Sequence, residues 1–446
     1  MMSLSRLLAA LPFLLLLCQQ CSCKGVLYYQ EPEGNMDGTC SGQPNTIKPW
    51  VGEPALKTQT INGSLYSAGE GDDEIYVVHV YGSAYSMGFA QGKLLKDQIN
   101  KIIPAFFQHV EQEIENEITF LPKDLQQLVA KYGLDGALDI TYDLTKRYIP
   151  KYFLEELEGV ADGADVDYKL LRRVHMLPEL VKAGCSMLGA WGSALSDPSG
   201  MIQLRSLDWD ADGPLQQAPA VVVYHPDQGH PFINVGWTGW IASISGVSSS
   251  KIAISEKHSD MTFGEESRAG IPFNILMRDI LQFDNTLDEA LQRIENAHRT
   301  CSIWLGVGDG NLKTFRLVEY SKSTAKWFDD KSITQIDEDR FNREHCDDAC
   351  YKDYNMTDLV YWGVHLGCWN SLLHAQHGHI NATQVINMIG SVKTGNLQAV
   401  VYDLGNDMMY ISNAAVDSSS PKANAFDRQF VRLDTKALFS VPKPQL

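Results

Sequence analysis

The sequence predicts an α+β protein in which two antiparallel β-sheets are covered by helices. Up to about residue 180, apolar residues recur at steps of three and four, which is the period of an α-helix. After residue 185, short apolar runs bounded by turn residues are typical of strands. Strands, then two helices, then more strands indicate a layered fold. The 446 residues exceed the usual size of one core, so we expect two domains or one large layered domain.

The helical pattern begins at Gly92 and is clearest between residues 99 and 118, where Ile, Phe and Val recur at helical spacing. We expect Pro104 to kink this helix rather than end it. Residues 24–75 are rich in Gly, Pro, Asn and Asp and are expected to be irregular. Further helices are expected at Leu125–Tyr132, Ala137–Arg147 and Tyr152–Ala161.

The second part of the chain is predicted to be mainly β. A strong turn signal, Ser-Asp-Pro-Ser-Gly at residues 196–200, predicts a hairpin between the first two strands. The strands are expected at Ser186–Leu195, Met201–Leu207, Ala218–Tyr224, Phe232–Ile244, Lys251–Ser255, Ser302–Val307, Thr314–Glu319, Ala399–Leu404 and Met409–Ser412. Helices are expected at Pro272–Leu281, Leu287–His298 and Ala382–Ile389.

The charge balance argues against a nucleic-acid partner. The chain has 55 acidic and 37 basic residues and a formal net charge of −18, whereas proteins that bind nucleic acids present clustered Lys and Arg to the phosphates. The acidity has two interpretations, which are general solubility and adaptation to an acidic compartment. An apolar fraction of 44% is ordinary for a globular protein.

The first 23 residues are typical of a secretory signal peptide. An apolar run at residues 7–17 follows Arg6 and precedes small or thiol residues at 21–23. The run is too short for a membrane span, and we expect no transmembrane segment elsewhere. Three Asn-x-Ser/Thr triplets, at Asn62, Asn355 and Asn381, are predicted glycosylation sites. We therefore expect a glycoprotein that is secreted or resides in the lysosomal lumen.

Nine cysteines fit the same compartment, because an oxidising environment favours disulfides, although their connectivity is not readable from sequence. They lie at positions 18, 21, 23, 40, 185, 301, 346, 350 and 368. The group formed by His345, Cys346, Cys350 and Cys368, with several nearby histidines, has the residue types of a zinc site. A disulfide that uses Cys346, Cys350 or Cys368 is the simpler interpretation, and we expect no metal.

Cys185 is the candidate nucleophile. It lies where the helical pattern changes to strands, and the predicted hairpin returns Arg205 and Asp208 to its side. A reactive thiol needs a nearby cation or base to raise its thiolate fraction, and an orienting carboxylate. The alternative is a buried cysteine beside an ordinary Arg–Asp pair.

The residue before this cysteine suggests self-cleavage. Gly184 has no Cβ, so its backbone can distort to let the thiol of Cys185 attack the Gly184 carbonyl. Cleavage would free an α-amine at Cys185, whose ordinary pKa of about 7.7–8.0 suits a general base.

Several segments together resemble the penicillin-acyltransferase-like family of N-terminal-nucleophile (Ntn) hydrolases, whose lysosomal members include acid ceramidase and N-acylethanolamine amidase. The resemblance covers about residues 76–415. The segments that carry it are 82–95, 154–164, Gly184-Cys-Ser followed by 205–209, Trp237-Thr-Gly239, Gly246 and Ser255-Glu256.

The resemblance implies a four-layer αββα sandwich of two antiparallel sheets and a self-processing enzyme. After a signal peptide at residues 1–23, a mainly helical fragment would span residues 24–184, and the catalytic fragment would span 185–446. Cleavage would fall between Gly184 and Cys185, and the fragments would stay associated. Cys185 would be the nucleophile, Asp208 would hold its α-amine, and Arg205 would lie beside the thiol.

Other site residues are less firmly placed. Glu256 is a candidate active-site carboxylate by position, with a surface charge as its alternative. The family's oxyanion-hole Asn has no matching motif here, so Asn370 and Asn234 are both candidates. Trp237 and Trp240 have two interpretations, the lining of a substrate pocket or core packing.

The activity implied by the resemblance is hydrolysis of linear carbon–nitrogen amide bonds through a thioester, with N-acyl lipid-type amides as substrates and no cofactor. A lipid-presenting activator is a further expected partner. Three alternatives stay open: an acyltransferase, a phospholipase B-like ester hydrolase, and a non-catalytic binding protein with the same fold.

Overall fold

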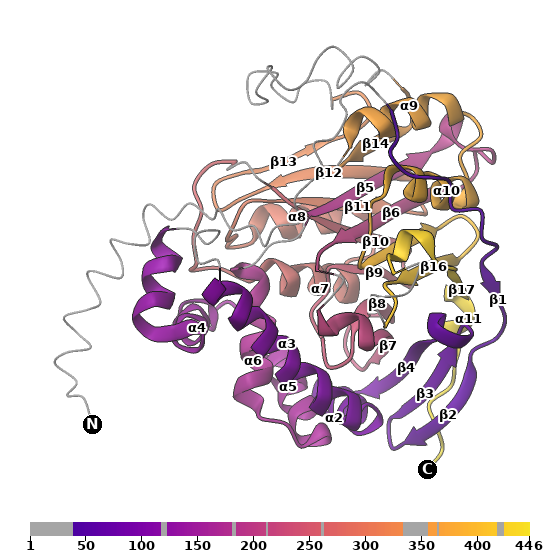
Figure 1. Ribbon diagram of the computed structural model, residues 1–446. Coiled ribbons are helices and arrows are strands. Elements are labelled where there is room, and N and C mark those ends of the chain that lie inside the picture. Colours follow the sequence, from indigo (N-terminus) through magenta and orange to yellow (C-terminus); the bar gives the residue numbers. More distant parts are fainter. Residues whose placement is uncertain are drawn as a thin grey trace, which may run out of the picture.

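The computed structural model describes residues 39–116, 123–180, 184–210, 213–259, 263–332, 356–363, 365–416 and 423–446. In this part of the chain, two β-sheets pack against each other and helices cover the outer face of each sheet (Figure 1). The predicted α+β sandwich of two sheets is therefore confirmed.

The larger sheet has ten strands in the order β13-β12-β11-β10-β9-β8-β7-β4-β3-β2. Its strands are β2 (Ala55–Thr60), β3 (Gly63–Ala68), β4 (Ile75–Gly82), β7 (Pro219–Pro226), β8 (Phe232–Trp237), β9 (Ser245–Ser248), β10 (Ile252–His258), β11 (Ile303–Asp309), β12 (Thr314–Tyr320) and β13 (Ala325–Phe328). The smaller sheet has seven strands in the order β1-β17-β16-β15-β6-β5-β14. Its strands are β1 (Trp50–Val51), β5 (Gly184–Trp191), β6 (Met201–Asp208), β14 (Leu359–Trp362), β15 (Gln398–Asp403), β16 (Met408–Asn413) and β17 (Val431–Asp434).

Two ladders differ from the predicted antiparallel pairing. β4 runs parallel to β7, and β1 runs parallel to β17, whereas the other described ladders are antiparallel. The strands β1, β2 and β3 lie inside residues 24–75, which were expected to be irregular. The edge strand β2 is exposed along nearly its whole length, so its sequence has no apolar alternation that would reveal a strand.

Helices from both parts of the chain cover the outer face of the larger sheet. Their apolar side chains form one core with Val78, Val80 and Val222 of β4 and β7. The helices are α2 (Ala84–Leu94), α3 (Lys96–Asn116), α4 (Lys123–Thr145), α5 (Lys151–Ala164), α6 (Tyr168–Met176), α7 (Phe273–Phe283) and α8 (Leu287–Asn296). In Figure 1, α2 to α6 gather on one side of the molecule.

Two backbone features of this helical layer bear on the predictions. Pro104 lies inside α3, which continues on both sides of it, as expected. As predicted at Leu125–Tyr132 and Ala137–Arg147, two helices lie on either side of a kink at Gly133, whose φ of 71° is not helical; both carry the label α4.

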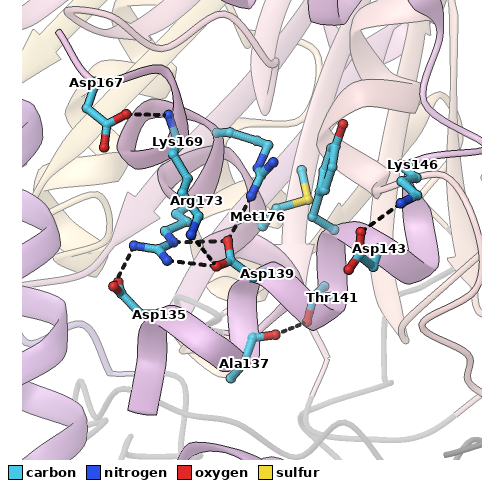
Figure 2. A network of polar contacts seen from close by, with 12 residues as sticks. Asp135, Ala137, Asp139, Thr141, Asp143, Lys146, Asp167, Lys169, Arg173 and Met176 are labelled. Atoms are coloured by element: carbon cyan, nitrogen blue, oxygen red, sulfur yellow. Dashed lines mark hydrogen bonds and ion pairs between the residues drawn. The ribbon is translucent and has the colours of Figure 1, made fainter. Parts of the chain in front are cut away.

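The packing of α4 against α6 is held by a network of ion pairs (Figure 2). The carboxylate of Asp139 accepts hydrogen bonds from Arg173 and Arg172 at 2.7 and 2.8 Å, and Lys169 lies 3.0 Å away. Hydrogen bonds from these cations, that of Arg173 first, hold the pKa of Asp139 well below its usual value. The network fixes α6, which leads into the chain segment before Cys185.

The smaller sheet packs on the inner face of the larger sheet, and helices cover its outer face. Side chains such as Val77 and Val223 of the larger sheet meet Met187 and Val400 of the smaller sheet in the core between the sheets. The helices α9 (Leu366–Gln376) and α10 (Ala382–Val392) cover the outer face of the smaller sheet, and the short α11 (Thr435–Phe439) contributes Leu438 to the core between the sheets. Sequence periodicity did not predict α6, α9 or the strands β9, β13, β14 and β17.

A disulfide joins Cys40 to Cys368, with sulfur atoms 2.06 Å apart, and so ties the start of the described chain to α9. Of the three cysteines considered for a disulfide, Cys346, Cys350 and Cys368, the last therefore forms one. Among the described helices, none has the length and apolar content of a membrane span.

Candidate active site

The hairpin of β5 and β6 brings the predicted catalytic residues together. Cys185 is the register partner of Leu207, Arg205 pairs with Met187, and Asp208 pairs with Gly184. Because side chains alternate along a strand, Cys185 and Arg205 project to the same face of this sheet. Asp208 lies opposite the residue on the other side of the proposed scissile bond.

The thiol of Cys185 lies against a buried ion pair. The Nη2 of Arg205 is 3.6 Å from the Sγ of Cys185 and 3.3 Å from the Oε2 of Glu256, and the Nε of Arg205 donates to the backbone oxygen of Glu256 at 3.4 Å. The side chain of Arg205 is fully buried and that of Glu256 is 8% exposed. Glu256 belongs to β10 of the other sheet, so the arginine spans the two sheets at this point. The structure thus places Glu256 beside the thiol rather than on the surface.

Burial controls the charge state of this thiol in the intact chain. Desolvation raises the pKa of Cys185 to about 12, while the Arg205 guanidinium lowers it and the Glu256 carboxylate raises it further. The thiol is therefore neutral across the physiological pH range in the uncleaved chain. Gly184 lies within β5, and an added Cβ there would make only ordinary contacts with Asp208, so the packing in the intact chain does not by itself require a glycine.

Asp208 is held by a loop that the sequence did not reveal. Its carboxylate accepts hydrogen bonds from the hydroxyl of Thr394 at 2.7 Å and from the backbone N–H groups of Gly395 and Asn396 at 2.6 and 3.1 Å. Burial raises the pKa of Asp208 to about 6, and these three hydrogen bonds oppose that rise. The available signal was the Thr-Gly-Asn run after α10, where Gly395 adopts a φ of 81°.

An apolar pocket with a cavity volume of about 70 Å³, partly open to solvent, reaches this cluster. Its walls come from both sides of the Gly184–Cys185 bond, with Ile103 and Phe106 from α3 and Leu207 from β6. Arg205 and Glu256 line the pocket, and Cys185 lies behind Arg205 with no exposed surface.

Trp237 and Trp240 both line this pocket and are at the same time 5% and 8% exposed. Both sequence-based interpretations therefore apply, because the two indoles line the pocket and are also largely buried in the core.

The two asparagines considered for the oxyanion hole do not line this pocket. Asn370 accepts a hydrogen bond from the hydroxyl of Tyr361 at 2.6 Å, on the outer face of the smaller sheet, opposite to the face of Cys185. Asn234 donates to the backbone oxygen of Ala242 at 2.9 Å. A third asparagine, Asn396, lies in the loop that holds Asp208, and its Oδ1 accepts a hydrogen bond from the N–H of Trp209 at 2.9 Å.

The remaining predicted sites fall outside the pocket or outside the described residues. Asn62 lies in the turn between β2 and β3, and Asn381 caps α10 by accepting from the N–H of Gln384. Asn355, His345, Cys346, Cys350 and the signal segment 1–23 lie outside the described residues. Cys368 is in the disulfide, and the described residues contain no cluster of three or more His, Cys, Asp or Glu that could hold a metal.

Comparison with solved structures finds limited likeness. The N-acylethanolamine-hydrolyzing acid amidase orthologue of Caenorhabditis elegans matches 56% of this chain and 100% of its own, at 12% identity and a TM-score of 0.35. Penicillin V acylase from Agrobacterium tumefaciens matches 52% of this chain and 83% of its own, at 10% identity and a TM-score of 0.33. TM-scores this low carry no argument about this chain.

Sequence comparison gives a clearer result, although no family model matches the chain. Protein dcd1A of Dictyostelium discoideum is 37% identical over 425 residues, which cover 91% of this chain and 95% of that protein. Protein dcd1B of the same organism is 35% identical over 407 residues, which cover 88% of this chain and 80% of that protein. The chain therefore belongs to the same family as the Dictyostelium proteins dcd1A and dcd1B.

Proposed function

We propose that this chain is the precursor of a self-processing cysteine amidohydrolase that cleaves linear amides of the N-acyl, lipid-like type. The observation that carries the proposal is the contact between the Cys185 thiol and Arg205 at 3.6 Å, on the wall of an apolar pocket. A nucleophile, a neighbouring cation and an apolar cavity are the parts that acyl transfer from a lipid-like amide requires.

Maturation would begin with attack of the Cys185 sulfur on the carbonyl carbon of Gly184. The carbon–sulfur bond forms, the carbon–nitrogen bond breaks, and the thiol proton passes to the departing nitrogen, which becomes the α-amine of Cys185. Water then hydrolyses the thioester, restoring the thiol and leaving a carboxylate on Gly184. The raised pKa of the Cys185 thiol in the intact chain supports an inactive precursor.

In the mature enzyme, the α-amine of Cys185 would take the thiol proton as the sulfur attacks the substrate carbonyl. The amine product leaves with that proton, and a water molecule activated by the α-amine hydrolyses the thioester. Asp208 is suited to hold the resulting α-ammonium, because its carboxylate is fixed by three donors opposite Gly184.

Two groups are suited to stabilise the negative oxygen of the tetrahedral intermediate. The Nη1 of Arg205 is buried on the pocket wall and has no acceptor among the described residues. Asn396 is a better placed donor than Asn370. Its Oδ1 is occupied by Trp209, which leaves Nδ2 to donate, and the next residue, Leu397, bonds to the register partner of Cys185. Each such donor typically contributes about 2.7–4 kcal/mol to transition-state stabilisation.

The compartment that fits this proposal is the lysosomal lumen or the extracellular space. The signal-like segment at residues 1–23 supports it, and so does the disulfide between Cys40 and Cys368, because disulfides persist in oxidising compartments.

The test is N-terminal sequencing of the purified mature protein, combined with assays on matched N-acyl amide and ester substrates. We expect a fragment that begins at Cys185 and faster turnover of the amide. Turnover of the ester alone would show that the protein is an esterase rather than an amidase. An uncleaved and inert chain at both acidic and neutral pH would contradict the proposal.

A further inference from the structure

The pocket beside Cys185 contains hydrogen-bond donors that the proposed chemistry does not use. Its lining is mostly aliphatic and aromatic, and Arg205 and Glu256 form its charged end. Thr238 and Trp240, in the turn after β8, line another part of the same pocket. Polar atoms in an otherwise apolar pocket usually fix the orientation of a ligand.

Both residues have a polar atom that is buried in the wall of this pocket. Thr238 is fully buried and Trp240 is 8% exposed, yet the Thr238 Oγ1 and the Trp240 Nε1 have no hydrogen-bond partner among the described residues. A buried polar group without a partner is unfavourable and rare in folded proteins. An oxygen-bearing ligand in the pocket would offer the acceptor that these atoms lack among the described residues.

The neighbouring side chain of His175 cannot serve as the partner of Trp240. Its ring stacks on the indole, with centroids 4.8 Å apart and planes at 12°. The Nδ1 of His175 donates to the backbone oxygen of Leu171 at 2.8 Å, and its Nε2 accepts from the N–H of Ile241 at 3.0 Å. Since both ring nitrogens are occupied, the histidine positions the indole by stacking and leaves its N–H for another acceptor.

Backbone hydrogen bonds and close packing hold the turn that presents these two donors. The N–H of Thr238 bonds to the backbone oxygen of Ala218, and the N–H of Trp240 bonds to that of Trp237, each at 3.0 Å. Gly239 between them has a φ of 79°, and a Cβ there would come within 3.2 Å of Ile99. The donors are therefore preorganised, which lowers the entropic cost of binding an acceptor.

We propose that Thr238 and Trp240 form an oxygen-recognition site, which selects substrates whose acyl chain carries a hydroxyl group in its otherwise apolar length. This inference rests on the proposed function, because it assigns the pocket to the acyl chain. A hydroxyl oxygen accepts from the indole N–H, which can only donate, and exchanges a hydrogen bond with the threonine hydroxyl. A purely hydrocarbon chain would leave both donors unpaired and is disfavoured.

The kinetic test compares N-acyl amides of one chain length, one unsubstituted and the others with a hydroxyl moved along the chain. For the wild-type protein, we expect one hydroxyl position to raise kcat/KM by about tenfold or more over the unsubstituted amide, which corresponds to about 1.4 kcal/mol. Thr238→Val and Trp240→Phe keep the shape of the pocket and should each remove most of this preference. The control is Trp237→Phe, which removes an indole nitrogen from the same pocket and should keep the preference.

A binding test separates failure of this inference from failure of the proposed function. Calorimetry with the free fatty acid and the matching hydroxy acids, on the purified full-length protein, needs no turnover. If the hydroxy acid binds more tightly and both variants abolish the difference, the site stands even when no amide is hydrolysed. Equal binding of the two acids by the wild-type protein overturns the site, and so does a preference that survives in both variants or disappears equally in Trp237→Phe.

Discussion

Glu156 on α5 and Arg278 on α7 form an ion pair in which neither side chain is exposed to solvent. The Nη2 of Arg278 lies 2.6 Å from the Oε2 of Glu156, and its Nη1 donates to Glu156 and to the backbone oxygen of Ile241. The guanidinium also lies over the ring of Tyr224, 4.5 Å from its centroid. Glu156 precedes the proposed cleavage site and Arg278 follows it, so this pair joins the two expected fragments.

Loss of one member of this pair should destabilise the protein strongly. Glu156→Gln or Arg278→Met leaves the other group buried without its counter-charge, which typically costs about 3–5 kcal/mol. The double variant Glu156→Leu with Arg278→Met should recover most of that loss, because no charge remains buried. Denaturant unfolding measures both effects. The exposed pair Lys322–Glu265 is the control, and Glu265→Gln should leave stability unchanged; equal stability of the single and double variants would contradict the prediction.

Cys185→Ala should abolish both fragment formation and turnover. The reason is that the proposed cleavage and the proposed hydrolysis use the same sulfur. Gel electrophoresis and an amide-hydrolysis assay measure the two effects. Cys301→Ala is a matched control, since Cys301 is also a fully buried thiol, and it should still be cleaved. A cleaved and active Cys185→Ala variant would exclude Cys185 as the nucleophile.

Glu256→Gln should lower the pKa of the Cys185 thiol in the intact chain. The Glu256 carboxylate raises that pKa by its negative charge, and the neutral amide removes this contribution while Arg205 stays in place. Alkylation of Cys185, followed by mass spectrometry across a pH series on uncleaved protein, gives the thiol pKa. The exposed Glu53→Gln should show the wild-type profile. An unchanged or higher thiol pKa in Glu256→Gln would show that the carboxylate does not act on the sulfur.

Asp208→Asn should reduce turnover by on the order of 10²-fold or more, while folding is largely kept. Burial raises the pKa of Asp208 to about 6 in the folded chain. This pKa is higher than in the unfolded chain, so ionisation of Asp208 lowers the stability of the fold as the pH rises from the unfolded-chain pKa to about 6. Asparagine removes this cost and also the charge that would hold the α-ammonium of Cys185. Kinetic constants and the thermal unfolding midpoint at pH 7 are the measurements, and a fully active variant would remove the assigned role.

Acid should destabilise the fold through His79 and His225. Their rings share a hydrogen bond at 3.3 Å, and burial lowers their pKa values to about 3 and about 4. The unfolded chain binds these protons as the pH falls through about 6.5, whereas the folded chain binds them only at lower pH. The stability contributed by the neutral rings is therefore fully present above that pH and falls as the pH drops toward 4, by roughly 3 kcal/mol for each histidine.

His79→Phe should flatten this pH dependence, because it removes one titrating ring and keeps an aromatic ring beside Tyr66. Unfolding midpoints between pH 7 and pH 4 measure the slope, with the exposed His374 as the control position. An identical slope in His79→Phe and wild type would show that this pair does not set the acid sensitivity.

The candidate site was only partly predictable from sequence. The turn signal at residues 196–200 correctly paired β5 with β6, because local turn chemistry sets the register of a hairpin. The long strand expected at Phe232–Ile244 ends instead at Trp237, since Gly239 turns the chain. Asn370 was chosen by its position in the sequence, but it lies on the outer face of the smaller sheet.

The sequence alone determined that Cys185, Arg205 and Asp208 share one hairpin, because strand alternation and a short turn are local properties. Only the tertiary structure decided which other groups reach them. Glu256 contacts Arg205 from the other sheet across 51 positions, and Thr394 bonds to Asp208 across 186. Such contacts depend on how two sheets pack and where a loop ends, and neither feature produces a periodic pattern in the sequence. The same holds for Thr238 and Trp240, whose donors lack a partner among the described residues and whose turn packs against Ile99 of α3 and His175 of α6.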